Sequence, residues 1–117
     1  MAVKPYTVTR LSGGNLYYWD NMTESDTAAP VYVPPGYNDK TFFCNGAAGG
    51  GTIGLLGSLD PAETDVAEFA ALTDPQGSAI ALSDEQASVV AENMLLYAPG
   101  TPTGSSVDLN CWLLVVT

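Results

Sequence analysis

The sequence predicts a mainly β protein, a single-domain antiparallel β-sandwich or barrel of jelly-roll-like type, with at most one or two short helical turns. Two observations lead to this prediction. Runs of alternating apolar and polar residues recur along the chain, as in strands with one buried face. Clusters rich in Gly, Pro, Asn and Ser separate these runs, as expected of turns between strands.

The totals indicate one globular domain, residues 1–117, that includes a short N-terminal arm over residues 1–5. Apolar residues make up 46% of the chain, which is too many for a disordered protein. No apolar run approaches the ~18 residues of a membrane-spanning helix, so we expect no membrane partner. The first residues lack the apolar segment of a signal peptide, and we therefore expect synthesis and retention in the cytoplasm.

The charge balance is strongly acidic, with a net charge of −10 and only three basic residues, Lys4, Arg10 and Lys40. Binding of a nucleic-acid backbone requires clustered Lys and Arg, and these three are scattered. Direct nucleic-acid binding is therefore not expected. The acidity instead favours solubility at high concentration.

In the first half of the chain, strands are predicted over residues 6–11, 16–19, 31–33 and 40–44. Residues 13–15, Gly-Gly-Asn, predict the tight turn between the first two strands. Residues 20–30 are polar and predict a loop. Prolines flank 31–33 on both sides, which indicates an edge strand, because a missing backbone N–H does no harm there.

The middle of the chain, residues 50–82, predicts strand, corner, strand, turn and strand. Alternation sends Ile53, Leu55 and Leu59 to one face of the first of these strands. The second strand is expected over 66–72, and Ile80 and Leu82 resume the alternation after a turn that contains Pro75 and Gly77.

Two segments stay open between helix and strand. In 61–72, the run Asp60-Pro61-Ala62-Glu63 also resembles a helix start, with an N-cap, a first-turn proline and a capping-box Glu. In 84–96, Ser83-Asp84-Glu85-Gln86 repeats the capping box, and apolar residues follow at helical spacing.

The segment 107–117 has the strongest strand signal. Every second residue from Val107 to Val115 is apolar, but Trp112, Leu114 and Val116 make the opposite face apolar too. A strand that is apolar on both faces must be covered on both. Either a loop of this chain or another subunit covers the second face, and the candidate interface residues are Trp112, Leu114 and Val116, together with Tyr32.

The chain has two cysteines, Cys44 and Cys111, and no histidine. Each cysteine lies in an apolar, strand-like run. They are interpreted as buried free thiols or, after release from the cell, as a disulfide. Two distant cysteines without histidine do not predict a zinc site, and the absence of histidine removes the commonest general base.

No catalytic, cofactor or metal site is predicted. Asp60, Glu63 and Asp65 are close in sequence, but they lack the spacing and the Gly of a calcium loop, and a solvated acidic corner is the preferred interpretation. The Gly-rich run 45–51 lacks the Gly-Lys-Ser/Thr ending of a phosphate loop and precedes a strand, so a hairpin connection or close packing is favoured. We therefore expect that the protein is not an enzyme.

Several segments resemble a known group of proteins. They are Gly-Thr-Ile-Gly-Leu-Leu-Gly-Ser-Leu-Asp-Pro from Gly51, Phe-Ala-Ala-Leu-Thr-Asp-Pro-Gln-Gly from Phe69, and Ala98-Pro99 before a Gly-rich loop and the last strand. The matching residues are Gly51, Thr52, Gly57, Ser58, Asp60, Leu72, Thr73, Asp74, Gly77 and Ala79. With its segments in this order, the chain resembles the small β-sandwich structural proteins of tailed bacteriophages. The resemblance is greatest to capsid decoration, or cement, proteins.

The resemblance implies a virion component on the capsid surface, made in the host cytoplasm. Its partners would be the major capsid protein and itself, as a homo-oligomer such as a trimer, and its task would be to bridge capsid subunits against the pressure of packaged DNA. Such proteins usually carry a longer N-terminal arm than residues 1–5 supply. The alternatives are another virion part, such as a head–tail connector, tail or fibre-associated protein, and a small carbohydrate-binding module that uses Tyr and Trp residues.

Overall fold

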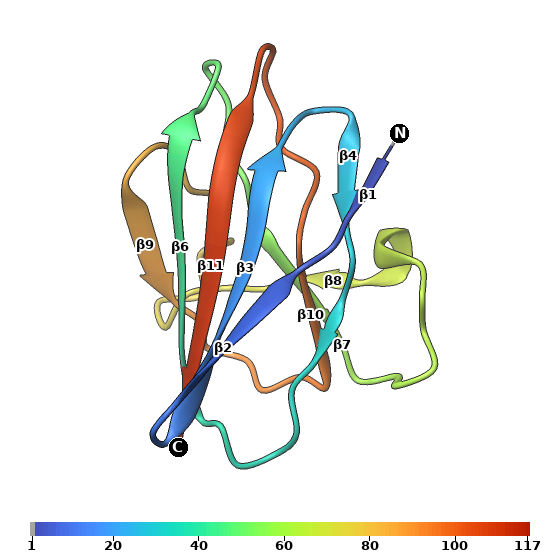
Figure 1. The fold of residues 1–117 in the computed structure, drawn as a ribbon, viewed down its shortest axis with the longest axis vertical. Helices are drawn as coiled ribbons and strands as arrows, with labels where there is room; N and C mark the ends of the chain where they lie inside the picture. Colours follow the sequence, from blue (N-terminus) through green and yellow to red (C-terminus); the bar gives the residue numbers. More distant parts are fainter. Residues whose placement is uncertain (1) are drawn as a thin grey trace.

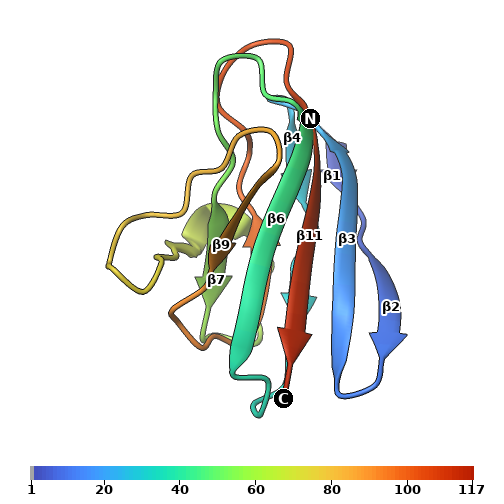
Figure 2. The same ribbon diagram turned by 90° about the vertical axis from the view of Figure 1, so that its left-hand side faces the viewer.

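A computed structural model describes residues 2–117 and shows a mainly β protein. Two sheets stack into a sandwich-like domain, and a separate pair of short strands lies beside them (Figures 1 and 2). The helical content is one 3-10 turn, η1 (Val66–Glu68). The predicted fold class, a β domain with at most one or two helical turns, is therefore confirmed.

The larger sheet has five strands, which lie side by side in Figure 1. Their order across the sheet is β2 (Thr7–Leu11), β3 (Gly14–Met22), β11 (Asp108–Val116), β6 (Asp39–Ala47) and β9 (Gln86–Val89). All four pairings in it are antiparallel. The predicted C-terminal strand is confirmed as β11, and it is the central strand, paired on both edges.

The second sheet has four shorter strands. Their order is β5 (Val31–Tyr32), β10 (Leu96–Pro99), β7 (Leu55–Ser58) and β8 (Ala70–Ala71). β5 lies at the edge of this sheet, as its flanking prolines predict.

The N-terminal arm is a strand rather than a free extension. β1 (Ala2–Lys4) pairs in parallel with β4 (Asp26–Ala28), and Met1 of the predicted arm lies outside the described residues. The predicted loop over 20–30 is wrong at its start, where β3 continues to Met22, and over Asp26–Ala28, which form β4. The buried Asp26 carboxylate closes the connection by accepting hydrogen bonds from the backbone N and the Oγ1 of Thr23, at 3.0 and 2.8 Å.

The first hairpin turns at Ser12 and Gly13, one residue earlier than predicted. Gly13 has a φ of 80°, a left-handed conformation that glycine adopts without a steric penalty. The turn therefore falls where the chain needs a positive φ, and Gly14 begins the next strand.

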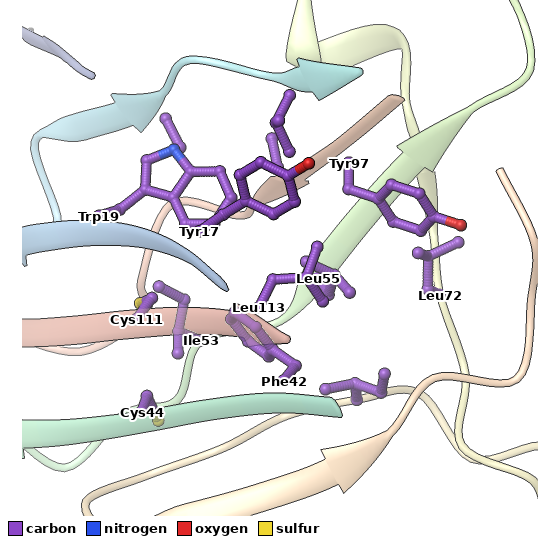
Figure 3. Packing of buried hydrophobic residues seen from close by; sticks show 14 of the residues in the cluster. Tyr17, Trp19, Phe42, Cys44, Ile53, Leu55, Leu72, Tyr97, Cys111 and Leu113 are labelled. Atoms are coloured by element: carbon purple, nitrogen blue, oxygen red, sulfur yellow. The ribbon is translucent and has the colours of Figure 1, made fainter. Parts of the chain in front are cut away.

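The core lies between the two sheets (Figure 3). From the five-stranded sheet, Trp19, Phe42 and Leu113 point into it, and from the other side Ile53 and Leu55 meet them. Each of these five is at most 1% exposed. The Trp19 indole Nε1 donates to the Ala29 carbonyl at 3.0 Å, so the largest core side chain also has its polar atom satisfied.

Residues 61–72 form neither the predicted strand over 66–72 nor a full helix. A turn is followed by η1, and only Ala70–Ala71 pair as β8. The Asp65 side chain accepts a hydrogen bond from Ala67 N at 3.0 Å and caps this single turn. The turn ends at Phe69, where the backbone becomes extended, and Phe69 and Leu72 are both buried.

Residues 84–96 contain no helix. The capping-box hydrogen bond is present, from Ser83 N to Gln86 Oε1 at 2.8 Å, but it closes a turn. Glu85 has a φ of 56°, which is incompatible with a right-handed helix. β9 then pairs with the edge of β6, so its backbone hydrogen bonds form between strands.

The alternation in 53–59 holds for two of its three residues. Ile53 and Leu55 are buried, but Leu59 is 63% exposed because β7 ends at Ser58. Ile80 and Leu82 are buried as predicted, although they lie outside any strand, and Leu82 forms an isolated bridge with Ile53.

Candidate functional site

The five-stranded sheet has an apolar face that points away from the core. Directly opposed residues in an antiparallel sheet share a face, so the pairing register assigns each side chain to one side. We call this surface the outer face. Its large apolar members are Leu11, Leu16, Tyr18, Phe43, Val89, Trp112, Leu114 and Val116.

The outer face is arranged in rows that run across the strands. One row is aromatic, with Tyr18 opposite Trp112 and Trp112 opposite Phe43. The ring centroids are 4.8 Å apart for Tyr18 and Trp112, which stack at 28°, and 5.4 Å apart for Phe43 and Trp112. The next row has smaller side chains, with Leu114 between Leu16 and Thr41.

An open depression of about 370 Å³ lies where the two rows meet. Its lining residues are Leu16, Thr41, Phe43, Trp112 and Leu114, all from β3, β6 and β11. No loop residue contributes to the lining, so within residues 2–117 no loop lies over the centre of this surface. The sequence predicts two alternatives for the second apolar face of the last strand, coverage by a loop of this chain or by another subunit. The loop alternative is therefore wrong for this region.

The centre of the outer face carries no charge among the described residues. The polar side chains of the two rows are threonines, Thr7, Thr9 and Thr41. The row beyond the aromatic row carries Asn45 and Asn110, and the Tyr18 hydroxyl donates to Asn110 Oδ1 at 3.3 Å. Acidic residues lie only at the strand ends, with Asp39 at one end and Asp20 and Asp108 at the other. An uncharged centre with a charged rim is the pattern of surfaces that exclude water on binding.

The predicted interface residues divide between two places. Trp112, Leu114 and Val116 lie together on the outer face, each partly exposed. Tyr32 is 51% exposed but lies on β5 in the other sheet. The structure therefore does not bring Tyr32 into the same surface.

Sequence analysis missed Leu16, Tyr18 and Phe43 as members of this surface. Their signal is the same as that of the last strand, because apolar side chains stand next to one another along β3 and β6. Tyr17 and Phe42 point inward, so their neighbours point outward. Consecutive apolar residues in three adjacent strands thus mark a sheet that is apolar on both sides.

The two cysteines are directly opposite each other on β6 and β11, and both are buried free thiols. The Cys44 Sγ donates to the Ser83 carbonyl at 3.0 Å. Burial raises the pKa of Cys44 to about 11 and also raises that of Cys111. Raised pKa values and burial make both thiols unreactive in the folded chain.

The acidic corner contributes to backbone capping. Asp60, Glu63 and Asp65 each accept a hydrogen bond from a backbone N–H two residues later, at 3.0, 3.3 and 3.0 Å. Among residues 2–117, no cluster of three or more metal-ligating side chains is placed to hold an ion. These carboxylates therefore stabilise local turns.

The Gly-rich run packs closely against the loop that precedes β11. A Cβ at Gly49 would overlap the Ser105 carbonyl, and one at Gly51 would overlap the Thr103 carbonyl. The run leads to an isolated bridge at Ile53 and then to β7, so no helix N-terminus follows it to hold a phosphate. Of the interpretations given to this run, close packing is the one that the structure supports.

One buried charge could not be identified from the sequence. Lys40 is 2% exposed, and its Nζ donates to Asn38 O at 3.3 Å and to Asn93 Oδ1. Burial lowers the pKa of Lys40, and the nearby Asp39 and Glu92 partly offset this. Asn38 and Asn93 also line a second cavity of about 210 Å³. Lys40 does not line this cavity, but its hydrogen bonds hold two of the lining residues, Asn38 and Asn93, in place.

The fold and this surface define a class: a small acidic β-sandwich domain whose larger sheet is apolar on both sides. In the described part of the chain, no helix is long and apolar enough to cross a membrane. Comparisons with protein-family models, with curated proteins and with solved structures found no match.

Proposed function

We propose that this protein is a virion structural protein that decorates the outside of a tailed-phage head and stabilises it by bridging capsid subunits. The observation that carries the proposal is the outer face, an apolar surface beyond the protein's own core. A protein that works by adhesion needs such a surface and needs no reacting groups. The phage-like segments from Gly51 and from Phe69 supply the link to capsids.

The net charge supports the same proposal. At −10, the chain is repelled by DNA, and its acidity favours solubility at high concentration. A specific contact typically buries ~800 Å² on each partner. Repetition of such contacts over a shell makes attachment strong through multivalency, even when a single contact is weak.

Add-back to capsids tests the proposal directly. Purified protein is mixed with expanded phage heads that lack a decoration protein, and the shell is imaged by cryo-electron microscopy. Saturable density on the outer surface, in many copies per head, is the expected result. Absence of binding at high protein concentration would contradict the proposal. Density at the neck or tail alone would favour the other virion parts.

A small carbohydrate-binding module is the second candidate, and the aromatic row favours it. Trp112 stacks on Tyr18 at the surface, and a stacked aromatic platform can bind sugar rings. Trp19 cannot take part, since it is fully buried. A glycan array with the wild type and with Trp112→Ala tests this candidate. Glycan binding that Trp112→Ala abolishes would support a carbohydrate-binding module, and no glycan binding by the wild type would contradict it.

A further inference from the structure

We propose that the outer face packs against the outer face of a second copy of this chain and forms a two-fold dimer of stacked five-stranded sheets. This inference rests on the proposal that the outer face works by adhesion, and it deepens that proposal by naming the molecule that covers the face while the protein is free of the capsid. Two observations favour a second copy as the occupant: the order of the rows and the size of the face.

The rows make the surface complementary to itself. The aromatic row of Tyr18, Trp112 and Phe43 stands next to the row with Leu114 at its centre, and the depression lies between them. Consider a two-fold axis that runs parallel to the two rows and midway between them. It places the aromatic row of each copy over the Leu114 row of the other. Every contact is then made twice, as in an isologous interface. Two stacked sheets pack in this way when they lie ~10 Å apart and their facing side chains interdigitate.

The size of the face suits one partner of the same size. The five strands have nine, nine, nine, five and four residues. At ~3.4 Å per residue and ~4.8 Å between strands, their projected area is roughly 600 Å². Side-chain relief makes the accessible area larger, close to the ~800 Å² per partner of a standard interface. One flat face covers another completely, whereas a three-fold arrangement of flat faces would leave part of each exposed.

The charges determine how the dimer responds to salt. None of the three basic residues lies on the outer face, because Lys4 is on β1, Arg10 points to the opposite side of β2, and Lys40 is buried. The dimer thus brings together two chains of net charge −10 with no opposite charges to pair across the outer face, and salt screens their repulsion. Self-association should therefore strengthen as ionic strength rises.

Sedimentation equilibrium of the full chain, without capsids, tests the dimer. The expected mass is twice the 12.2 kDa of the chain, with tighter association at higher salt. Leu114→Glu places a charge in the interface and should raise the dissociation constant by about 100-fold or more. The matched control is Leu59→Glu, which lies outside the outer face and is 63% exposed, and it should leave the dissociation constant within about twofold.

Tryptophan fluorescence of the wild type keeps the test independent of a variant's folding. Trp19 is fully buried and bonded to Ala29 in the single chain, so its environment stays constant. Trp112 alone should shift to longer emission wavelength on dilution, with increased quenching by acrylamide. A monomer at high concentration, a dimer unaffected by Leu114→Glu in a folded variant, or association that weakens with salt would overturn the inference.

The two experiments separate this inference from the proposed function. Add-back that succeeds while the free protein stays monomeric would overturn the dimer and leave the decoration role intact. A dimer that ignores capsids would overturn the decoration role and leave the dimer intact.

Discussion

Cys44 and Cys111 face each other across β6 and β11 as two free thiols in the core. Both have 0% exposure, and burial raises the pKa of Cys44 to about 11. At pH 8 only roughly one Cys44 in a thousand is a thiolate, the form that reacts.

We therefore expect neither thiol to react with iodoacetamide in the native protein, and both to react in denaturant. The measurement is intact mass spectrometry after labelling without a reductant. Two added groups in denaturant and none in the native state are expected. A mass two hydrogens lower, with no labelling in denaturant, would show that the two cysteines are bridged.

The two tryptophans should differ in their contribution to stability. Trp19→Phe leaves a cavity and an unpaired Ala29 carbonyl in the core, and we expect it to lower the free energy of unfolding by about 2 kcal/mol. Trp112→Phe on the outer face should cost less than about 1 kcal/mol. Urea unfolding at low protein concentration measures both. Equal losses would contradict the assignment of the two sides of the sheet.

Adjacent glycines should respond differently to alanine. Gly49 and Gly50 have φ values of 57° and 77°, so Ala at either carries a strain of about 1 kcal/mol. A Cβ at Gly50 has no neighbour within 4 Å, whereas one at Gly49 overlaps the Ser105 carbonyl. Gly49→Ala should therefore cost about 3 kcal/mol in total, since the clash adds roughly 2 kcal/mol. Similar unfolding midpoints for the two variants would show that the Gly-rich run does not pack closely.

Glu92 should make stability depend on pH in the acid range. Burial raises the pKa of its carboxyl, but hydrogen bonds from Thr73 N and Oγ1, at 2.9 and 2.6 Å, and the charge of Lys40 outweigh this, so the pKa is lowered. A lowered folded-state pKa gives stability that is present above the unfolded value and is lost as the pH falls through the folded value.

Glu92→Gln should accordingly reduce the loss of stability between about pH 5 and the acid-unfolded range. Denaturant titrations at several pH values measure this loss. Glu68→Gln is the control, because Glu68 is exposed on η1. If both variants followed the wild-type pH profile, the hydrogen bonds to Thr73 would have no electrostatic role.

Local pattern predicts where the long strands lie, although the predicted 16–19 and 40–44 cover only part of β3 and β6, which have nine residues each, as does β11. Among the three, alternation assigns the buried side only in β11, as for Leu113, because apolar residues are adjacent along β3 and β6. The edge position of β5 also follows from its prolines. These features depend on the two-residue period of a strand and on the missing N–H of proline. Both are local properties of the sequence and require no distant partner.

The short segments could not be predicted in the same way. The Ser83–Gln86 capping box forms its hydrogen bond, yet a strand follows because the β6 edge is open beside it. Leu59 continues an apolar alternation but lies on the surface because its strand has ended. In each case a distant partner, or its absence, outweighs a local preference worth less than a tertiary contact.

From the sequence alone, the β class and the apolar nature of both sides of the last strand could be determined, because these depend on the identity of residues two apart. Only the tertiary structure decided that Leu16, Tyr18 and Phe43 join Trp112 and Leu114 in one uncovered face, and that Tyr32 does not. The physical reason is register: side chains from three strands gather on one surface only when hydrogen bonding between distant segments aligns them.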